Sequence, residues 1–462
     1  MEIDHGHRTE PPALPGGLLG VGHSAAFLRD PVAFLIGAQK TMGGPFTFSL
    51  LGKRVSYFFG PEANAAVLAA EDAVLDRRPA YRAVIASLGQ GVGIGAEPEA
   101  MAEQMRLLVP SLQREAMAQH VPVMLTEVEE YVSAWGERGE VDLLDVVHDL
   151  SARIAARCLA GPRLAPSLHG RLPALLRDLQ GALALGSLVN PYLPLPAFRR
   201  RDRAREELLR AVMRAHQQTN PAATGDPVPE SQKLYQRFKG AGHGDERQSD
   251  DYFAARLVLN AVFAATETTA AHAAWTGVLL LQHHDWLQRL RQEQESLFRD
   301  TPAITPQLFG RMTHLRHCAM EAERMHPSVA LMMRTTRAPF THGPYQVPTG
   351  RLVLLSPAAS HRLPSVFRDP DRYDPARFAP GREEHRSRPT PLIGFGGGQH
   401  PCVGMNFAYQ QITVIWSVLL RAFDLELVSP STARDRRALM NIPRRPTLVR
   451  YRRRPHAART LA

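Results

Sequence analysis

Residues 395–404 read Phe395-Gly396-Gly397-Gly398-Gln399-His400-Pro401-Cys402-Val403-Gly404, a glycine-rich loop that carries one cysteine and precedes a stretch with helical periodicity. Glycines allow the backbone to turn tightly and to approach a flat cofactor. The N-terminus of the helix expected after the loop favours the thiolate form of Cys402. A thiolate presented in this way suits an axial ligand of haem iron. The alternative is a buried structural cysteine beside an ordinary glycine-rich loop.

The loop matches F-x-x-G-x-[HR]-x-C-x-G at every fixed position and so resembles the haem loop of the cytochrome P-450 superfamily. The resemblance implies that Cys402 is the metal ligand of haem b. It also implies further cofactor-binding residues, with the haem propionates bound by His400 and Arg334 and with Tyr81 and Arg106 as weaker candidates that could equally be surface residues. These cofactor-binding candidates are Cys402, His400, Arg334, Phe395, Gly398, Tyr81 and Arg106.

A second motif, Glu321-Ala322-Glu323-Arg324, resembles the E-x-x-R motif of the same family. An acid and an arginine three residues apart share one helix face, and a planar guanidinium can bridge a carboxylate and backbone carbonyls. Pro375-Ala376-Arg377-Phe378 resembles the loop whose arginine completes that network, so the resemblance makes Arg377 the third member. Taken alone, E-x-x-R would fit a solvated helical ion pair equally well.

The third motif, Ala264-Ala265-Thr266-Glu267-Thr268-Thr269, lies in an apolar stretch that predicts a long buried helix from about Ser249 to Leu281. It resembles the family's [AG]-G-x-[DE]-T-[TS] over the distal haem face. The resemblance makes Thr268 and Glu267 catalytic, the hydroxyl donating to dioxygen and the carboxylate feeding protons to it. A core threonine and a rim glutamate are the structural alternative. Ala265 replaces the usual glycine, so we expect a tighter oxygen groove.

The remaining sequence predicts a mainly α protein with small β-sheets, the triangular, helix-rich, single-domain cytochrome P-450 fold that the resemblance implies. We expect a flexible polar N-terminus over residues 1–15, one monooxygenase domain over 16–455 and a tail over 456–462. Within the domain we expect hairpins at 46–60 and 344–356, an apolar loop at 186–197, a mobile linker at about 220–250 and an arginine-rich stretch near the C-terminus.

Longer stretches resemble the bacterial sterol 14α-demethylases over most of the chain. The substrate motif of that group, Y-x-F-x-x-P-x-F-G-x-x-V, keeps its tyrosine at Tyr81, but Ala83, Ala86 and Leu88 replace its Phe, Pro and second Phe. Losing two aromatic walls and a rigid proline should reshape the pocket. That group also has a histidine where this chain has Glu267. The substrate-pocket candidates are Tyr81, Ala83, Leu88 and Ala264.

Composition sets the broad class. The 462 residues, 44% of them hydrophobic and 22% charged, are ordinary for a globular protein and exclude global disorder. Only Cys158, Cys318 and Cys402 occur, which argues against a disulfide framework and for the cytoplasm. We expect Cys158 and Cys318 to be core residues, and we expect no secretion signal and no membrane anchor.

The function expected is a haem-thiolate monooxygenase that inserts one oxygen atom from O2 into a bulky lipophilic substrate, such as a terpenoid or steroid. Electrons would come from a ferredoxin with an NAD(P)H-dependent reductase, because no flavin or dinucleotide-binding motif is visible. The formal charge of +10 would steer such an acidic partner, and no nucleic-acid partner is expected. Two alternatives remain open: sterol 14α-demethylation, and a haem protein that senses or binds a ligand without turnover.

Overall fold

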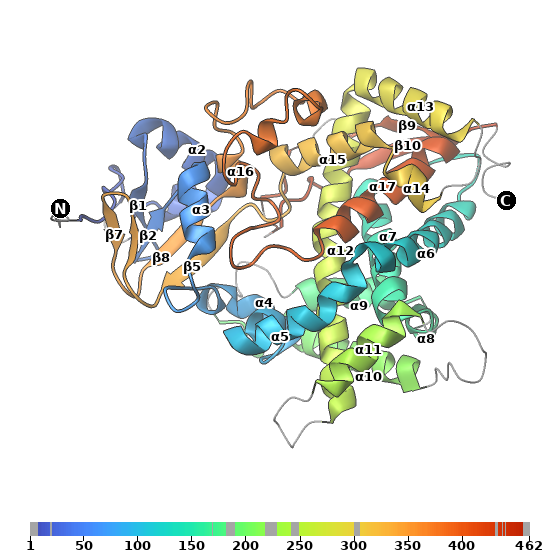
Figure 1. Ribbon diagram of the computed structural model, residues 1–462, viewed down its shortest axis with the longest axis horizontal. Coiled ribbons are helices and arrows are strands. Elements are labelled where there is room, and N and C mark those ends of the chain that lie inside the picture. Colours follow the sequence, from blue (N-terminus) through green and yellow to red (C-terminus); the bar gives the residue numbers. More distant parts are fainter. Residues whose placement is uncertain are drawn as a thin grey trace. The chain divides into compact units, whose positions relative to one another are not determined.

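The computed structural model describes residues 8–18, 21–168, 170–181, 190–217, 229–241, 249–299, 305–429, 433–436, 438 and 440–455. Helices dominate, and the strands form small sheets, as predicted (Figure 1). The chain divides into two compact units. One comprises Met1–Tyr81 with Met320–Cys402, and the other comprises Arg82–Ala319 with Val403–Ala462. They are called the sheet unit and the helical unit below.

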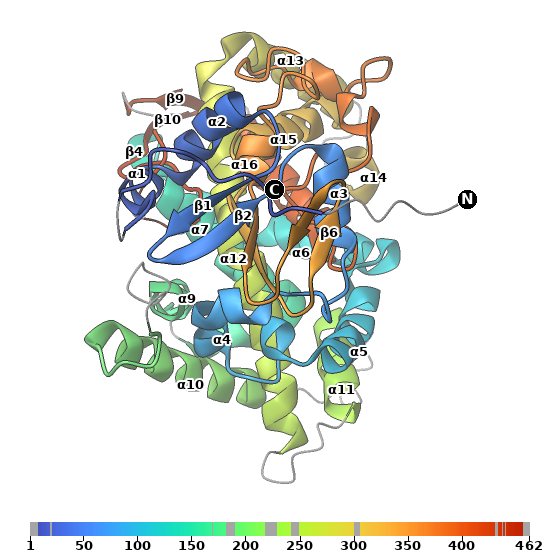
Figure 2. The ribbon, with the colours of Figure 1, turned by 90° about the vertical axis from the view of Figure 1, so that its left-hand side faces the viewer.

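The sheet unit is built on a five-stranded sheet in the order β1-β2-β8-β5-β3. Strands β1 and β2 are labelled in Figure 2, and β8 and β5 in Figure 1. Strand β2 pairs with β8 in parallel, and the other neighbours in the sheet are antiparallel. The elements of this unit are α1 (Ser24–Arg29), α2 (Pro31–Met42), β1 (Phe46–Leu50), β2 (Lys53–Tyr57), α3 (Pro61–Ala69), β3 (Leu75–Asp76), β5 (Met332–Thr336), β6 (Phe340–His342), β7 (Tyr345–Val347), β8 (Leu352–Leu355) and α16 (Pro357–Ser360). Helix α15 (Thr313–Met325) begins in the helical unit and ends in this one.

The hairpin predicted at 46–60 is confirmed as β1 and β2. Its turn is Leu51-Gly52, and both residues have positive φ, 50° and 76°, as a two-residue hairpin turn of this hand requires. The described part of the predicted flexible N-terminus is held against this hairpin, because Leu14 N donates to Thr47 O and Thr47 N donates to Pro12 O, each at 2.8 Å. The flexibility of residues 1–15 stays a prediction, and residues 1–7 lie outside the described ranges.

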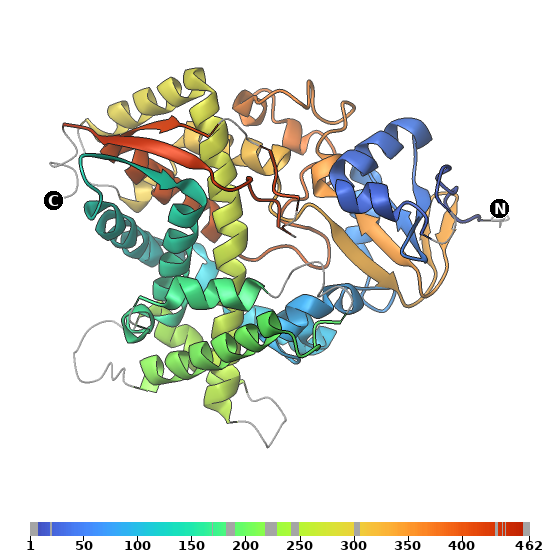
Figure 3. The same ribbon diagram turned by 180° about the vertical axis from the view of Figure 1, so that it is seen from behind.

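The helical unit surrounds α12, a 33-residue helix that Figure 3 shows as the long axis of this part. Helices α7, α10, α11 and α17 pack against it. The elements are α4 (Arg82–Leu88), α5 (Pro98–Leu108), α6 (Arg114–Ser133), β4 (Arg138–Asp142), α7 (Leu143–Ala155), α8 (Leu164–Ser167), α9 (Leu172–Gly181), α10 (Pro196–Gln217), α11 (Glu230–Gly240), α12 (Asp250–Gln282), α13 (His284–Phe298), α14 (Pro306–Phe309), α17 (Met405–Ala422), β9 (Phe423–Leu427) and β10 (Leu448–Arg453). None of the helices in the described ranges is long and apolar enough to cross a membrane.

Helix α12 matches the predicted buried helix within a residue at each end. Ser249 caps it by accepting a hydrogen bond from Tyr252 N. Acidic residues in its first turn stabilise the helix through their interaction with the helix dipole. Near its C-terminal end Gly277 allows α17 to approach, since a Cβ there would lie 1.8 Å from Trp416. Trp416 Nε1 donates to Ala273 O at 2.9 Å, which fixes this contact between the two helices.

The hairpin predicted at 344–356 is wrong. Its two strands exist, but β7 pairs with β6, whereas β8 pairs with β2 and β5 in the other sheet. Gly350, at φ 81°, turns the chain between them. Alternating apolar residues predict a strand without naming its partner, and here the partner of β8 lies in a distant part of the sequence.

The predicted linker and the arginine-rich stretch near the C-terminus both contain regular structure. The predicted linker at 220–250 includes helix α11, which buries Leu234, Tyr235 and Phe238. Lys233 and Gln236 are exposed on its other face, so average composition concealed an amphipathic helix. The arginine-rich stretch near the C-terminus forms β10, where alternate side chains are buried. Residues 218–228, 242–248 and 456–462 lie outside the described ranges, as do residues 186–189 of the predicted apolar loop.

Candidate functional site

The cysteine loop in the sheet unit is a set of tight backbone turns. Gly396 and Gly398 have positive φ, 73° and 58°, and a Cβ on Gly398 would lie 2.1 Å from Leu68 O. Only glycine fits this close approach. Cys402 N donates to Phe395 O at 2.9 Å and closes the loop, and Cys402 is exposed at its end. The loop therefore presents Cys402 at an exposed position.

Three of the predicted propionate-binding residues lie close together in the sheet unit. Arg334 is only 8% exposed and interacts with Tyr81, and burial lowers its pKa. His400 Nε2 lies 2.9 Å from Asp72 Oδ1. Sequence analysis missed Arg77, which joins this cluster: burial and the neighbouring Arg334 lower its pKa to about 10.

This cluster carries more positive than negative charge. Burial and then Arg77 lower the pKa of His400, and Asp72 is the acid that opposes these cations. Asp76 also acts on Arg77, but it already pairs with Arg78 and Arg337. The arginines therefore outnumber the carboxylates and leave room for a further anion, since buried charge is costly unless it is paired. The carboxylates of haem propionates fit this requirement. Arg106 belongs to the helical unit, where its largely exposed guanidinium pairs with Glu103.

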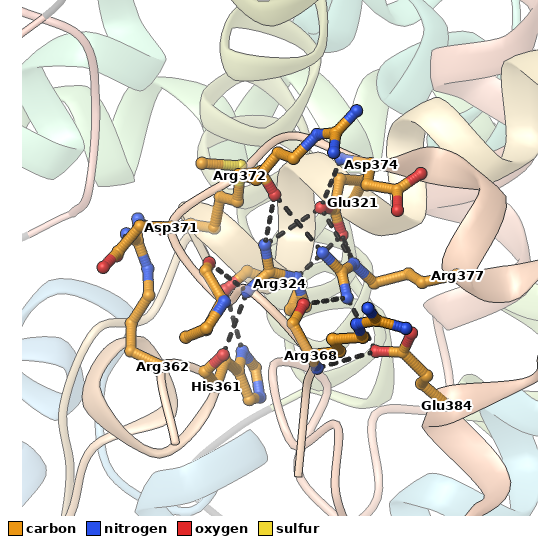
Figure 4. Close-up of polar contacts among 12 residues, drawn as sticks. Glu321, Arg324, His361, Arg362, Arg368, Asp371, Arg372, Asp374, Arg377 and Glu384 are labelled. Atoms are coloured by element: carbon orange, nitrogen blue, oxygen red, sulfur yellow. Dashed lines mark hydrogen bonds and ion pairs between the residues drawn. The ribbon is translucent and has the colours of Figure 1, made fainter. Parts of the chain in front are cut away.

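The predicted network of Glu321, Arg324 and Arg377 is present and fully buried (Figure 4). Arg324 donates to both oxygens of Glu321, from Nε at 2.7 Å and from Nη2 at 2.9 Å. Arg377 Nε donates to Glu321 Oε1 at 3.0 Å, and its Nη1 donates to Glu384 Oε2 at 2.6 Å. Both guanidinium groups also donate to backbone carbonyls of residues 361–372. The alternative of a solvated ion pair is therefore wrong.

His361 connects this network to the cysteine loop, and sequence analysis missed it. Ile393 N donates to Nε2 at 2.9 Å, so the other nitrogen, Nδ1, carries the hydrogen and donates to Arg324 O at 3.2 Å. Burial and the charge of Arg324 lower the pKa of His361 to about 3, which keeps the ring neutral. Ile393 O in turn accepts from Gly396 N in the loop. His361 stands in none of the sequence motifs, so the sequence carried no signal for this role.

The middle of α12 is unusual for a buried helix. Ala264 is exposed, and Ala265, Glu267 and Thr268 are half-buried, while the surrounding turns are largely buried. Thr268 Oγ1 donates to Ala264 O at 2.7 Å, one turn back. This contact can loosen the helix at the position where the distal groove was predicted. His272 packs in the interior as expected, with Nε2 2.7 Å from Ala319 O.

Glu267 has a partner that sequence analysis missed. Its Oε1 lies 2.7 Å from Nε2 of His148, a buried residue of α7. The two residues are far apart in sequence, and a lone histidine on an apolar helix face reads as core. Helix periodicity on α7 could have placed His148 on the buried face, but not against Glu267.

A cavity of about 370 Å³ lies among α4, α10 and the N-terminal half of α12. Leu88, a predicted substrate-pocket residue, and Ala86 are in its wall. Ala83 is buried in α4 but does not line this cavity, and neither does Ala264. Tyr81 belongs to the sheet unit, beside Arg334. The full set lining the cavity is Ile85, Ala86, Leu88, Gly89, Gln90, Tyr192, Arg205, Leu209, Tyr252 and Arg256.

Comparison with known proteins decides the family, because the sequence profile described as cytochrome P450 matches residues 11–450. The chain belongs to the cytochrome P450 family. Membership makes it a monooxygenase of the oxidoreductase class and implies a haem iron with a cysteine thiolate ligand, a redox partner that donates electrons, and a lipophilic substrate.

Three known proteins illustrate the relationship. A sterol 14-demethylase of Arabidopsis thaliana is 35% identical over 453 residues, covering 96% of this chain and 91% of the relative. A sterol 14α-demethylase of Mycobacterium bovis is 32% identical over 449 residues, covering 96% and 98%. The solved structure of retinoic acid bound cyanobacterial CYP120A1 aligns with a TM-score of 0.80 at 23% identity, covering 97% of this chain and all of that one, and so supports the fold.

Proposed function

We propose that this cytochrome P450 binds haem b through Cys402 and oxidises a bulky lipophilic substrate, such as a terpenoid or steroid. The observation that carries the proposal is the excess of positive charge at Arg77 and Arg334, beside His400, in the same unit as the cysteine loop. Haem supplies both an iron for the exposed Cys402 and two carboxylates for the two arginines. Bound haem would supply dioxygen activation, with the thiolate favouring cleavage of the O–O bond.

The chain's own contribution to the chemistry is proton supply. Thr268 presents a hydroxyl on the open part of α12, and Glu267 lies next to it with a carboxylate that is 25% exposed. A hydroxyl can hold a proton at the reacting oxygen, and a carboxylate can deliver the next one. We assign these two roles to Thr268 and Glu267. A protein that only sensed or bound a ligand would have no use for them.

The substrate proposal follows from the cavity wall. Ala86 stands where sterol demethylases have proline and Leu88 where they have phenylalanine, and both residues line the 370 Å³ cavity. Smaller, non-aromatic side chains give a wall of different shape. We infer that this protein shares its fold with the sterol demethylases but binds a polycyclic substrate of another class. Phe395 and Gly398 would contact the haem.

The second candidate is sterol 14α-demethylation, which is favoured by the names of relatives at 31–35% identity. Titration of the ferric protein with 14α-methyl sterols, and with a panel of terpenoids, steroids and macrocycles, separates the two. A low-spin to high-spin shift of the Soret band with sterols supports demethylation. A Soret shift only with a ligand of another class supports a cavity that binds a substrate other than a sterol.

The ligand assignment is tested by Cys402→Ser. We expect the reduced variant to lose the red-shifted carbon monoxide band, because the thiolate is the source of that shift. Cys158→Ala, at a buried cysteine of the helical unit, is the matched control and should keep the band. A Cys402→Ser protein that retains the band would place the ligand elsewhere and refute the proposal.

The electron donor is proposed to be an acidic ferredoxin with its reductase, located with this enzyme in the cytoplasm. The formal charge of +10 supports electrostatic steering of such a partner. Turnover with a ferredoxin should fall as ionic strength rises, because salt screens exposed charges over about 8–10 Å. Rates that do not change between low and high salt would contradict steering.

A further inference from the structure

A line of charged side chains runs from the surface of the helical unit to Glu267. Arg177 of α9 lies 2.6 Å from Asp149 Oδ1, and Asp149 follows His148 on α7. His148 Nδ1 lies 3.3 Å from Arg177 Nε and 3.6 Å from Asp149 Oδ1, and its Nε2 lies 2.7 Å from Glu267 Oε1. The histidine thus faces charged groups of three helices, α7, α9 and α12.

These side chains are exposed to solvent at both ends of the line and buried in between. Arg177 is 44% exposed and Asp149 26%, His148 falls to 6%, and Glu267 rises again to 25%. Water can therefore reach the groups at both ends, but not freely the ring between them. A buried ring with one nitrogen toward each end has the geometry of a proton shuttle.

We propose that His148 is the proton-transfer residue that recharges Glu267. The inference rests on the proposed function, because it needs Glu267 to give up a proton during the reaction. The imidazolium passes its Nε2 proton to the Glu267 carboxylate, which leaves a neutral ring and a neutral carboxyl group. The neutral ring then carries its hydrogen on Nδ1, so it turns about its χ2 bond to bring the bare Nε2 to the Asp149 side, takes up a solvent proton there and turns back. One proton therefore enters for each proton delivered.

The charge state of the ring supports this role. Burial would lower the pKa of His148, and Arg177 opposes protonation as well, but contacts with Asp149 and Glu267 outweigh them and raise the pKa to about 9. The ring therefore holds a proton throughout the neutral range. The pKa of Asp149 is lowered despite its burial, chiefly by His148 and Arg177, so its carboxylate stays ionised beside the ring.

A purely structural role makes different predictions, and His148→Gln separates the two. Glutamine can still donate a hydrogen bond to Glu267, but it cannot take up and release a proton. The matched control is His120→Gln, which changes a buried histidine of α6 whose Nε2 lies 3.0 Å from Ser111 O. Both variants should keep the carbon monoxide band and the Soret shift with the most effective ligand of the panel above.

The first measurement needs no turnover. In the reduced carbon monoxide form of the haem-loaded enzyme with 13C-labelled histidine, the NMR signal that is lost in His148→Gln should titrate near pH 9. It should titrate at least one pH unit lower in Glu267→Gln, which removes one of the charges that holds the proton. A midpoint below 7 in the parent, or no shift in Glu267→Gln, would overturn the pairing whether or not the enzyme turns over.

The second measurement uses turnover of the same panel ligand. His148→Gln should lower product formed per NAD(P)H oxidised by about tenfold or more, divert electrons to peroxide and increase the solvent isotope effect. His120→Gln should match the parent in all three. Unchanged coupling and isotope effect in His148→Gln would overturn the proposal. If no ligand is turned over by the parent, the proposed function fails, and the NMR titration decides the His148 pairing by itself.

Discussion

Arg377→Ala should destabilise the sheet unit strongly. The wild-type guanidinium is fully buried and donates to Glu321 at 3.0 Å, to Glu384 at 2.6 Å and to Arg368 O at 3.0 Å. Truncation leaves a buried carboxylate with one cation fewer and a carbonyl without its donor. Removing one partner of a buried ion pair typically costs about 3–5 kcal/mol. At about 1.4 kcal/mol per factor of ten, 4 kcal/mol is roughly a thousandfold in the folding equilibrium.

Two further variants calibrate that loss. Arg377→Lys keeps the charge but not the planar fork, so we expect an intermediate cost of about 2 kcal/mol. Arg368→Ala is the matched control from the same loop: its side chain is 87% exposed, and only its backbone carbonyl contacts Arg377. Its cost should stay within about 0.5 kcal/mol.

The assay is urea denaturation followed by far-UV circular dichroism, with haem loading measured as the ratio of Soret to 280 nm absorbance. Because the network holds His361, which holds the cysteine loop, we expect Arg377→Ala to lose haem loading along with stability. If Arg377→Ala differed from Arg368→Ala by less than about 1 kcal/mol and bound haem normally, the network would have no part in supporting the loop.

Three other perturbations address the remaining features. Gly277→Ala should cost about 1–3 kcal/mol or more in a urea titration, because its Cβ would collide with Trp416, whereas Gly37→Ala, with nothing within 4 Å, should gain about 0.5–1 kcal/mol; equal effects would contradict the close approach. The pKa of His361 is lowered from 6.5 to about 3, so the unfolded chain binds more protons between these values. Stability should therefore fall below pH 6.5, by up to about 1.4 kcal/mol per pH unit from this group, and His361→Gln should reduce that slope. Thr268→Ala should keep haem and divert electrons to peroxide, and fully coupled turnover would show that its hydroxyl is dispensable.

Sequence reasoning succeeded where chemistry is local. The cysteine loop is contiguous, Glu321 and Arg324 share one helical turn, and the pattern from Ser249 to Leu281 fixed α12 to within a residue. In each case backbone geometry alone brings the important side chains together. The resemblance to the family then added Arg377, which lies over 50 residues beyond Glu321.

The missed residues all act through contacts between distant segments. His148 meets Glu267 because α7 packs on α12, and Arg77 joins Arg334 across the chain. No periodicity or spacing encodes such pairs, since either partner alone resembles an ordinary core or surface residue. The misassigned hairpin at 344–356 has the same cause, because strand pattern does not specify the neighbouring strand.

The parallel pairing of β2 with β8 has a consequence for synthesis of the chain. Val55 and Leu352 are neighbours in the sheet, yet about 300 residues separate them. On the ribosome, β2 emerges long before its partner exists, and the intervening residues include most of the helical unit. Until β8 arrives, one side of the β1-β2 hairpin presents unpaired backbone groups, which are prone to pair with other chains. Expression conditions that slow elongation lengthen this exposed period. They should therefore lower the yield of haem-loaded protein.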